Sequence, residues 1–386
     1  MSGQHTVFWA PAHVVAYETW PDGGDSRSGY LMRIATFACA AALLLACGGR
    51  VDDPAPTDVG VAAPPRAPAP AAPSQSSPTR GVETVAGDVG APTAIALSGE
   101  AAYFVTRTTT LGGELVRAGA VFVAYKAGGD PLMLAIDKQG ATYEALALTS
   151  EHVFYGASDG RVLRVPARGG DVTEVASVGS PIVALSALGK DVYYAAESGE
   201  VGRLADEGGA LPLATLDGPA RALAATDDAV LVAGGGAPSE ILRVARDGAD
   251  PAPLAPAGGS ACGLIRAGDR AFWTAGPADP GTRGAARSVA LAGGAVATVA
   301  EGDFTACALA ADGKDLYFVT AAPQAALPVR ASGATPGVSL MRAPIAGGPA
   351  SPIESVAAPL PHHGALAADA THVYWLDATG VRRVRK

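Results

Sequence analysis

The stretch Gly364–Val384, GALAADATHVYWLDATGVRRV, contains the pattern on which most of this chain is built. It has a run of small apolar residues (Ala365–Ala367), a turn into an apolar and aromatic run (Val373–Trp375), and a basic-apolar run after Gly380. The same pattern recurs upstream at intervals of roughly 40–50 residues, a period typical of propeller blades. The chain is therefore a tandem array of one structural unit.

The copies align on an aromatic or apolar pair at the start of each unit's second strand. A small apolar run precedes each pair, and a third strand, a Gly-rich turn and a short fourth strand follow it. Four short strands separated by Gly and Asp turns indicate an antiparallel sheet. The pairs are Tyr103-Phe104, Phe154-Tyr155, Tyr193-Tyr194, Leu231-Val232, Phe272-Trp273, Tyr317-Phe318 and Tyr374-Trp375.

The predicted fold is all-β, a single seven-bladed β-propeller of four-stranded antiparallel blades. One such sheet cannot bury both of its faces alone, so the units must stack. Stacking around an axis leaves only short, protected edges, and the alanine-rich first strands suit the crowded positions near that axis. A linear β-solenoid or a sandwich is the alternative, which the long repeat period disfavours.

The last unit lacks a fourth strand, because the sequence stops soon after its third strand. Val82–Ala86 (VETVA) has the form of a fourth strand, like Val172–Ala176 (VTEVA), and no earlier part of a repeat precedes it. We therefore expect Val82–Ala86 to close the ring by pairing with Val381–Val384. This closure removes a strand edge that would otherwise promote aggregation.

The segment before the repeats contains the features of an export signal. Residues 1–31 show no periodic pattern and are interpreted as a non-native N-terminal extension, with an extended signal region as the alternative. Met32-Arg33 then opens a basic start, and Ile34–Leu45 is apolar but too short to span a bilayer of about 30 Å. Residues 32–47 thus have the dimensions of a signal peptide.

The end of this segment, Leu44–Gly48, resembles the lipobox of bacterial lipoproteins. The resemblance implies that Cys47 becomes a lipid-modified N-terminus and that Gly48, in place of Asp, directs the protein to the outer membrane, on its periplasmic or its surface side. An ordinary signal peptide with a chance cysteine is the alternative. Residues 48–80, rich in Pro and Ala, are predicted to be an extended tether, and residues 81–386 the propeller.

Two cysteines remain in the repeat region, Cys262 and Cys307. Each lies ten residues before the aromatic pair of its unit, so the two occupy equivalent places at the start of neighbouring inner strands. Disulfides persist in exported proteins, and we predict a bond between Cys262 and Cys307. The alternative is two buried thiols.

The other motifs that could carry chemistry are interpreted as structural features. His362-His363 is the one dense histidine pair, but consecutive residues of an extended chain point in opposite directions, so no metal is predicted there. The Asp-Gly motifs lack the alternating ligands of a calcium loop and are interpreted as turns. Third-strand arginines could form an anion-binding ring, but the interpretation as exposed strand positions is favoured; they are Arg164, Arg203, Arg243 and Arg342.

Long loops predict the binding surface. The second-to-third-strand loops are expanded at Thr106–Gly119, Gly276–Ala286 and Ala321–Gly337, and the connections at Asp137–Tyr143 and Glu354–His363 are long too. In a propeller these loops emerge on one face, and function often lies on loops held by a rigid scaffold. The candidate ligand residues on this face are Arg107, Arg117, Arg283, Arg330, His362 and His363.

The repeats resemble those of exported bacterial propellers of the NHL, YWTD and TolB-like kind over residues 81–386. That resemblance implies a fold but no single activity, because such propellers include binding proteins, scaffolds and enzymes. The formal charge of −9 leaves no basic surface for nucleic acid, and no nucleophile elbow, phosphate loop or dinucleotide motif is present.

We therefore expect a monomeric, lipid-anchored binding or scaffold module of the cell envelope that engages a protein or glycan and needs no cofactor. The alternative is a lyase or hydrolase that works at the channel mouth, with His362 or His363 as general acid or base.

Overall fold

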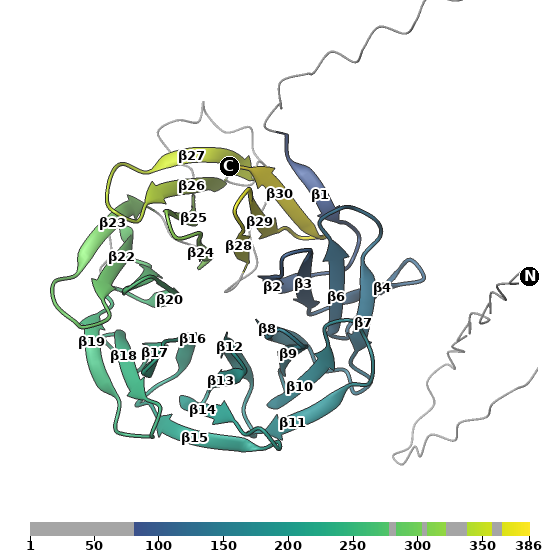
Figure 1. The fold of residues 1–386 in the computed structure, drawn as a ribbon, viewed down its shortest axis with the longest axis horizontal. Coiled ribbons are helices and arrows are strands. Elements are labelled where there is room, and N and C mark those ends of the chain that lie inside the picture. Colours follow the sequence, from purple (N-terminus) through teal and green to yellow (C-terminus); the bar gives the residue numbers. More distant parts are fainter. Residues whose placement is uncertain (1–80, 278–282, 303–306, 322–337, 357–364) are drawn as a thin grey trace, which may run out of the picture. The chain divides into compact units, whose positions relative to one another are not determined.

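The computed structural model describes residues 81–277, 283–302, 307–321, 338–356 and 365–386. Seven four-stranded antiparallel sheets surround a central axis (Figure 1). The inner strand of each sheet contacts the inner strand of the next, and β28 of the last sheet contacts β2 of the first. The predicted seven-bladed β-propeller is confirmed.

Blades 1 to 6 use their strands in chain order from the axis to the rim. Blade 1 contains β2 (Pro92–Leu97), β3 (Ala101–Thr106), β6 (Ala120–Tyr125) and β7 (Leu132–Ile136). Blade 2 contains β8 (Tyr143–Leu148), β9 (His152–Ala157), β10 (Arg161–Pro166) and β11 (Thr173–Ser177). Blade 3 contains β12 (Ile182–Leu188), β13 (Asp191–Ala196), β14 (Glu200–Leu204) and β15 (Ala210–Thr215).

Blades 4 to 6 follow the same order, whereas blade 7 has β1 as its rim strand. Blade 4 contains β16 (Ala220–Ala225), β17 (Ala229–Gly234), β18 (Glu240–Ala245) and β19 (Ala252–Pro256). Blade 5 contains β20 (Ala261–Ala267), β21 (Arg270–Ala275), β22 (Gly284–Ala290) and β23 (Ala297–Gly302). Blade 6 contains β24 (Leu309–Ala311), β25 (Asp315–Ala321), β26 (Val338–Pro344) and β27 (Ser351–Val356). Blade 7 contains β28 (Leu366–Ala368), β29 (His372–Leu376), β30 (Val381–Arg385) and β1 (Glu83–Ala86).

The aromatic pair of each second strand explains how the blades stack. Successive residues of a strand point to opposite faces of its sheet. In blade 3, Tyr193 packs into a cluster with blade 4 residues such as Val232, and Tyr194 packs into a cluster with blade 2 residues such as Phe154. Both tyrosines are fully buried. The pair therefore fills the interfaces on both sides of its blade.

Ring closure follows the predicted pairing. β1 pairs antiparallel with β30, with Glu83 opposite Arg383 and Ala86 opposite Val381. In Figure 1 the first strand lies beside the last one at the edge of blade 7. The Arg383 guanidinium also binds the Glu83 carboxylate at 2.6 Å. The strand begins one residue later than expected, because Val82 lies outside it and is exposed.

A charged contact between neighbouring blades recurs at three interfaces and was not predicted from the sequence. In each case a cation just after a third strand reaches an Asp and a Tyr of the preceding blade. Lys126 Nζ lies 2.9 Å from Asp369 and 5.5 Å from the centre of the Tyr374 ring. The other two contacts are Arg246 with Asp191 and Tyr193, and Lys386 with Asp312 and Tyr317. We call these three contacts the inter-blade clamps.

Two of the clamp carboxylates, Asp369 and Asp312, are stabilised as anions. Burial alone would raise the pKa of Asp369, but Lys126, the backbone N–H groups of Thr371 and His372 and the Tyr374 hydroxyl outweigh burial and lower it. Opposite charges and hydrogen bonds to a carboxylate both favour its ionised form. The Asp369 and Asp312 carboxylates therefore stay charged well into acid.

The antiparallel topology gives the propeller two distinct faces. The second-to-third-strand loops and the blade-to-blade connections emerge on one of them, the long-loop face. The other turns emerge on the opposite side, the short-turn face. In the blade 1 loop, β4 (Thr109–Leu111) and β5 (Glu114–Val116) form an unpredicted hairpin. The blade 5 loop was predicted too long, because β22 already begins at Gly284 and pairs with β21.

Gly380 provides a test of the closure. A Cβ atom at Gly380 would overlap the carbonyl oxygen of Ala86 in β1. Gly380→Ala should therefore lower the free energy of unfolding by about 2 kcal/mol, the range of overpacking substitutions, as measured by urea denaturation. Gly99→Ala is the matched control, since a Cβ there meets no atom within 4 Å. Equal stability of the two variants would contradict closure by β1.

Candidate functional site

The channel along the axis is lined by the inner strands of all seven blades and encloses a cavity of about 220 Å³. Each blade contributes one Leu or Ile at the same position of its repeat, directly across from the second residue of its aromatic pair. This apolar ring consists of Ile95, Leu146, Leu185, Leu223, Leu264, Leu309 and Leu366. The repeat alignment contained these positions, but their common place in the channel was not predicted.

The layer two residues before this ring differs from blade to blade and carries the chemistry of the channel mouth. It lies toward the long-loop face, where each inner strand begins. Blade 2 places Glu144 there, blade 3 Val183, blade 4 Arg221, and blades 5 and 6 Cys262 and Cys307. A regular scaffold thus presents one variable position per blade, as binding sites on rigid folds commonly do.

Arg107 lies at this mouth but its charge is already engaged. The guanidinium donates from Nη2 to Glu144 Oε2 at 2.8 Å and from Nε to Oε1 at 2.5 Å. This two-point hydrogen bonding to Glu144 raises the pKa of Arg107. The pair joins the long loop of blade 1 to the inner strand of blade 2, so Arg107 orders the rim and neutralises Glu144.

Among the described residues that line the cavity, Arg221 is the cation whose charge is not engaged. It is an exposed residue of β16, whose other residues are buried, and it lines the cavity. Within the described residues it makes no ion pair. The prediction from long loops missed Arg221, because it lies on an inner strand and not on a loop. Its signal was a charged residue in a run that is otherwise small and apolar, Ala220–Ala225.

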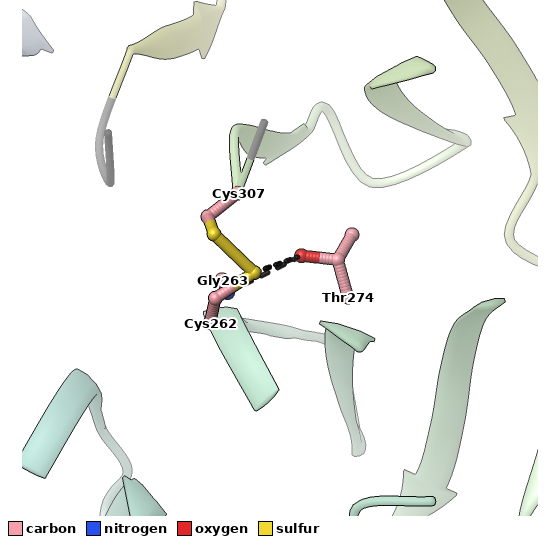
Figure 2. The surroundings of a disulfide bond; sticks show 4 residues. All are labelled: Cys262, Gly263, Thr274 and Cys307. Carbon is pink, nitrogen blue, oxygen red and sulfur yellow. Dashed lines mark hydrogen bonds between the residues drawn. A yellow bond between two sulfur atoms is a disulfide. The ribbon is translucent and has the colours of Figure 1, made fainter. Parts of the chain in front are cut away.

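The predicted disulfide is present. Cys262 and Cys307 are bonded, with their Cα atoms 5.1 Å apart, and both line the channel mouth. Thr274 Oγ1 lies 3.5 Å from Cys262 Sγ and accepts a hydrogen bond from the Gly263 N–H at 3.2 Å (Figure 2). A side chain at position 263 would overlap the carbonyl oxygen of Cys307, so this glycine permits the close approach of blades 5 and 6.

The other predicted ligand residues do not join this site within the described residues. Arg117 and Arg283 are exposed on the long loops of blades 1 and 5 and do not line the cavity. Arg330, His362 and His363 lie outside the described residues. The third-strand arginines also lie away from the channel, and three of them pair with an Asp of their own blade: Arg203 with Asp191, Arg243 with Asp228 and Arg342 with Asp315.

The described residues contain no cluster of three or more His, Cys, Asp or Glu side chains that could hold a metal ion. The described chain also has no helix with the length and hydrophobicity needed to cross a membrane.

Comparison with known proteins supports the fold. No protein family profile matches the chain, and no curated protein matches it in sequence. It is similar to the structure of the computationally designed Ika8 protein, with a TM-score of 0.52 and 17% identity over 78% of this chain and 99% of that one.

Two natural proteins give the same result. YCF48 bound to D1 peptide has a TM-score of 0.56 and 9% identity over 81% of this chain and 98% of that one. The WD40 propeller domain of Doa1 has a TM-score of 0.54 and 11% identity over 80% and 97%. At such identities the likeness establishes a shared propeller fold and nothing about ligands.

The disulfide should contribute measurably to stability. A cross-link between residues 45 positions apart restricts the unfolded chain, so reduction should lower the free energy of unfolding by about 3 kcal/mol. Urea denaturation with and without dithiothreitol measures this loss. The Cys262→Ser, Cys307→Ser double variant is the control and should not respond to the reductant. Identical curves for the unaltered protein under both conditions would contradict the expected contribution.

Proposed function

We propose that this protein is a lipid-anchored binding or scaffold module of the cell envelope, which holds a protein partner against the channel mouth of its long-loop face. The observation that carries the proposal is Arg221, an exposed cation without an ion pair among the described residues, at the edge of an apolar ring. An acidic group beside an apolar side chain complements this arrangement.

The size of the cavity favours a protein partner over a free small molecule. Pockets for drug-sized ligands typically enclose about 300–1,000 Å³, whereas this cavity encloses about 220 Å³. It suits one or two side chains of a larger partner. Its described lining contains no aromatic residue to stack on a sugar ring. A glycan therefore fits the site less well than a protein does.

The fold itself is compatible with this role. The similar propeller of YCF48 is bound to a peptide, and propellers commonly present binding surfaces on a rigid ring. This likeness is one of fold alone, so it supports peptide binding without identifying the partner. The disulfide keeps the mouth preorganised, and preorganisation reduces the entropy lost on binding.

The anchor rests on the sequence before the propeller. In the proposal Cys47 carries the lipid and residues 48–80 are the tether. A Pro-rich segment extends by about 3.1 Å per residue, so 33 residues would reach about 100 Å. β1 starts on the short-turn face, because its first residue pairs with Arg383 near the end of β30. The chain thus joins the ring on the side away from the channel mouth.

Arg221 tests the binding role. Native lipoprotein is purified from membranes by affinity capture after crosslinking, alongside Arg221→Glu and the control Arg385→Glu, which reverses an exposed arginine at the end of β30. We expect a protein that is captured by the unaltered chain and by the control, with at least fivefold less captured by Arg221→Glu. Equal capture by all three chains, or capture of glycan alone, would contradict the proposal.

The lipid anchor is tested separately at Cys47. Cells expressing the full chain are labelled with radioactive palmitate, and membrane and soluble fractions are compared. The unaltered chain should take up label and fractionate with membranes, whereas Cys47→Ser should take up none. Cys39→Ser is the control, since Cys39 lies inside the apolar segment that the signal interpretation removes. Label retained by Cys47→Ser would exclude this anchor.

A further inference from the structure

Five blades place an arginine at the same point of the third strand, which allows the repeats to be compared with one another. Each arginine lies directly across from the first residue of the aromatic or apolar pair in the second strand. They are Arg164 in blade 2, Arg203 in blade 3, Arg243 in blade 4, Arg342 in blade 6 and Arg383 in blade 7.

Four of these arginines are neutralised within their own blade. Blades 3 and 6 use the first residue of the second strand, so that Asp191 pairs with Arg203 at 3.7 Å and Asp315 pairs with Arg342 at 3.1 Å. Blade 4 uses Asp228, one residue before that strand. Blade 7 has His372 at this point, and Arg383 instead binds Glu83 of the fourth strand. The carboxylate thus comes from one of three positions: the first residue of the second strand, the residue just before it, or the fourth strand.

Arg164 has no Asp or Glu at the first or the last of these positions, and Glu151, which stands where blade 4 has Asp228, does not pair with it in the described chain. The first residue of its second strand is His152, where blades 3 and 6 have Asp. In the fourth strand the residue paired with Arg164 is Thr173, where the residue paired with Arg383 is Glu83. Within the described residues Arg164 makes no ion pair. Blade 2 is therefore the exception to a rule that the other four blades follow.

Arg164 lines a cavity between blades 2 and 3. The cavity, here called the blade 2–3 groove, holds about 320 Å³ and is lined by Arg164, His152 and Lys190 above an apolar floor that includes Phe154 and Leu204. His152 and Phe154 lie edge to face with ring centres 6.1 Å apart. The groove lies on the short-turn face, so it is distinct from the channel mouth.

Of the Arg and Lys side chains that line the groove, Arg164 is the one without a paired carboxylate. Asp206 also lines it but lies 2.9 Å from Lys190, in an ion pair whose side chains are 80% and 68% exposed. Glu151 at the rim is exposed and makes no ion pair with Arg164 in the described chain. The half-buried guanidinium of Arg164 therefore keeps its charge without a paired carboxylate in the described chain. Its planar set of N–H donors can bind a carboxylate at two points.

We propose that the blade 2–3 groove binds an acidic side chain of a protein partner, with an apolar neighbour of that side chain on the floor. One free positive charge matches a monoanionic carboxylate better than a dianionic phosphate. The Arg164 guanidinium would pair with the carboxylate of the ligand, as the equivalent arginines of the other four blades pair with an internal Asp or Glu. His152 adds a donor at the position where the internal acceptor is missing.

The test restores the internal carboxylate. The full chain in detergent is titrated with a fluorescein-labelled hexapeptide of alternating Glu and Val, and binding is followed by fluorescence anisotropy. The same peptide with Gln in place of Glu is the reference probe. We expect at least tenfold tighter binding of the Glu peptide. His152→Asp, which imitates blades 3 and 6, and Thr173→Glu, which imitates blade 7, should each weaken it at least fivefold.

Arg203→Gln is the matched control, because Arg203 already has its Asp, and it should leave the affinity unchanged. Thr173 is exposed, so Thr173→Glu keeps the test valid if His152→Asp does not fold. The proposal is overturned by equal binding of the two peptides, by unaltered affinity in both neutralising variants, or by an equal loss in Arg203→Gln. Displacement of the peptide by inorganic phosphate at far lower concentration than by acetate would overturn the carboxylate assignment.

Discussion

Each sheet of this propeller has two apolar faces and can remove them from water only against its neighbours. The core clusters accordingly draw their residues from adjacent blades: one joins Tyr194 of blade 3 to Phe154 of blade 2, and another joins Trp375 of blade 7 to Phe104 of blade 1. Burying such side chains stabilises by about 2–3 kcal/mol each. The blades are therefore stable only as a complete ring, and β1 completes that ring from the other end of the chain.

Closure also fixes the register of every blade, and register explains the charged contacts. A cation just after a third strand reaches the Asp and Tyr of the preceding blade because the strands of all blades start and end at the same heights. Lys126 and Asp369 are 243 residues apart in sequence, yet the ring places them as Arg246 and Asp191 are placed between blades 4 and 3. The equivalent positions of the other blades thus show which contact to expect, and a missing partner can be recognised by comparison with them.

The sequence predicted what depends on spacing alone. The repeat period determined the number of blades, the form of Val82–Ala86 revealed the closing strand, and the equivalent positions of Cys262 and Cys307 indicated the disulfide. These inferences succeed because a β-repeat converts residue number directly into height along a blade. The apolar ring of the channel was within reach of the same reasoning, since Leu or Ile occupies one position in every copy.

What the sequence left open depends on where side chains point. Arg107 was a reasonable ligand candidate until the structure placed Glu144 of the next blade against it. The third-strand arginines were treated as one class because their sequence positions agree. They differ in the residue that lies diagonally opposite on the adjacent strand. Which residue lies there is decided by register and not by sequence distance.

Arg221 and Arg164, two of the cations that make no ion pair among the described residues, lie on opposite faces of the disc. Arg221 is at the long-loop end of an inner strand, and Arg164 lies between two blades toward the short-turn face. A strand of six residues spans about 20 Å, so ligands on the two faces would not compete for space. The chain also enters at the short-turn face, where β1 begins. A partner in the blade 2–3 groove would thus lie on the face where β1 begins, and a partner at the channel mouth would face away from it. That separation is what a scaffold needs, because it lets one rigid body hold two proteins at a fixed distance without either blocking the other.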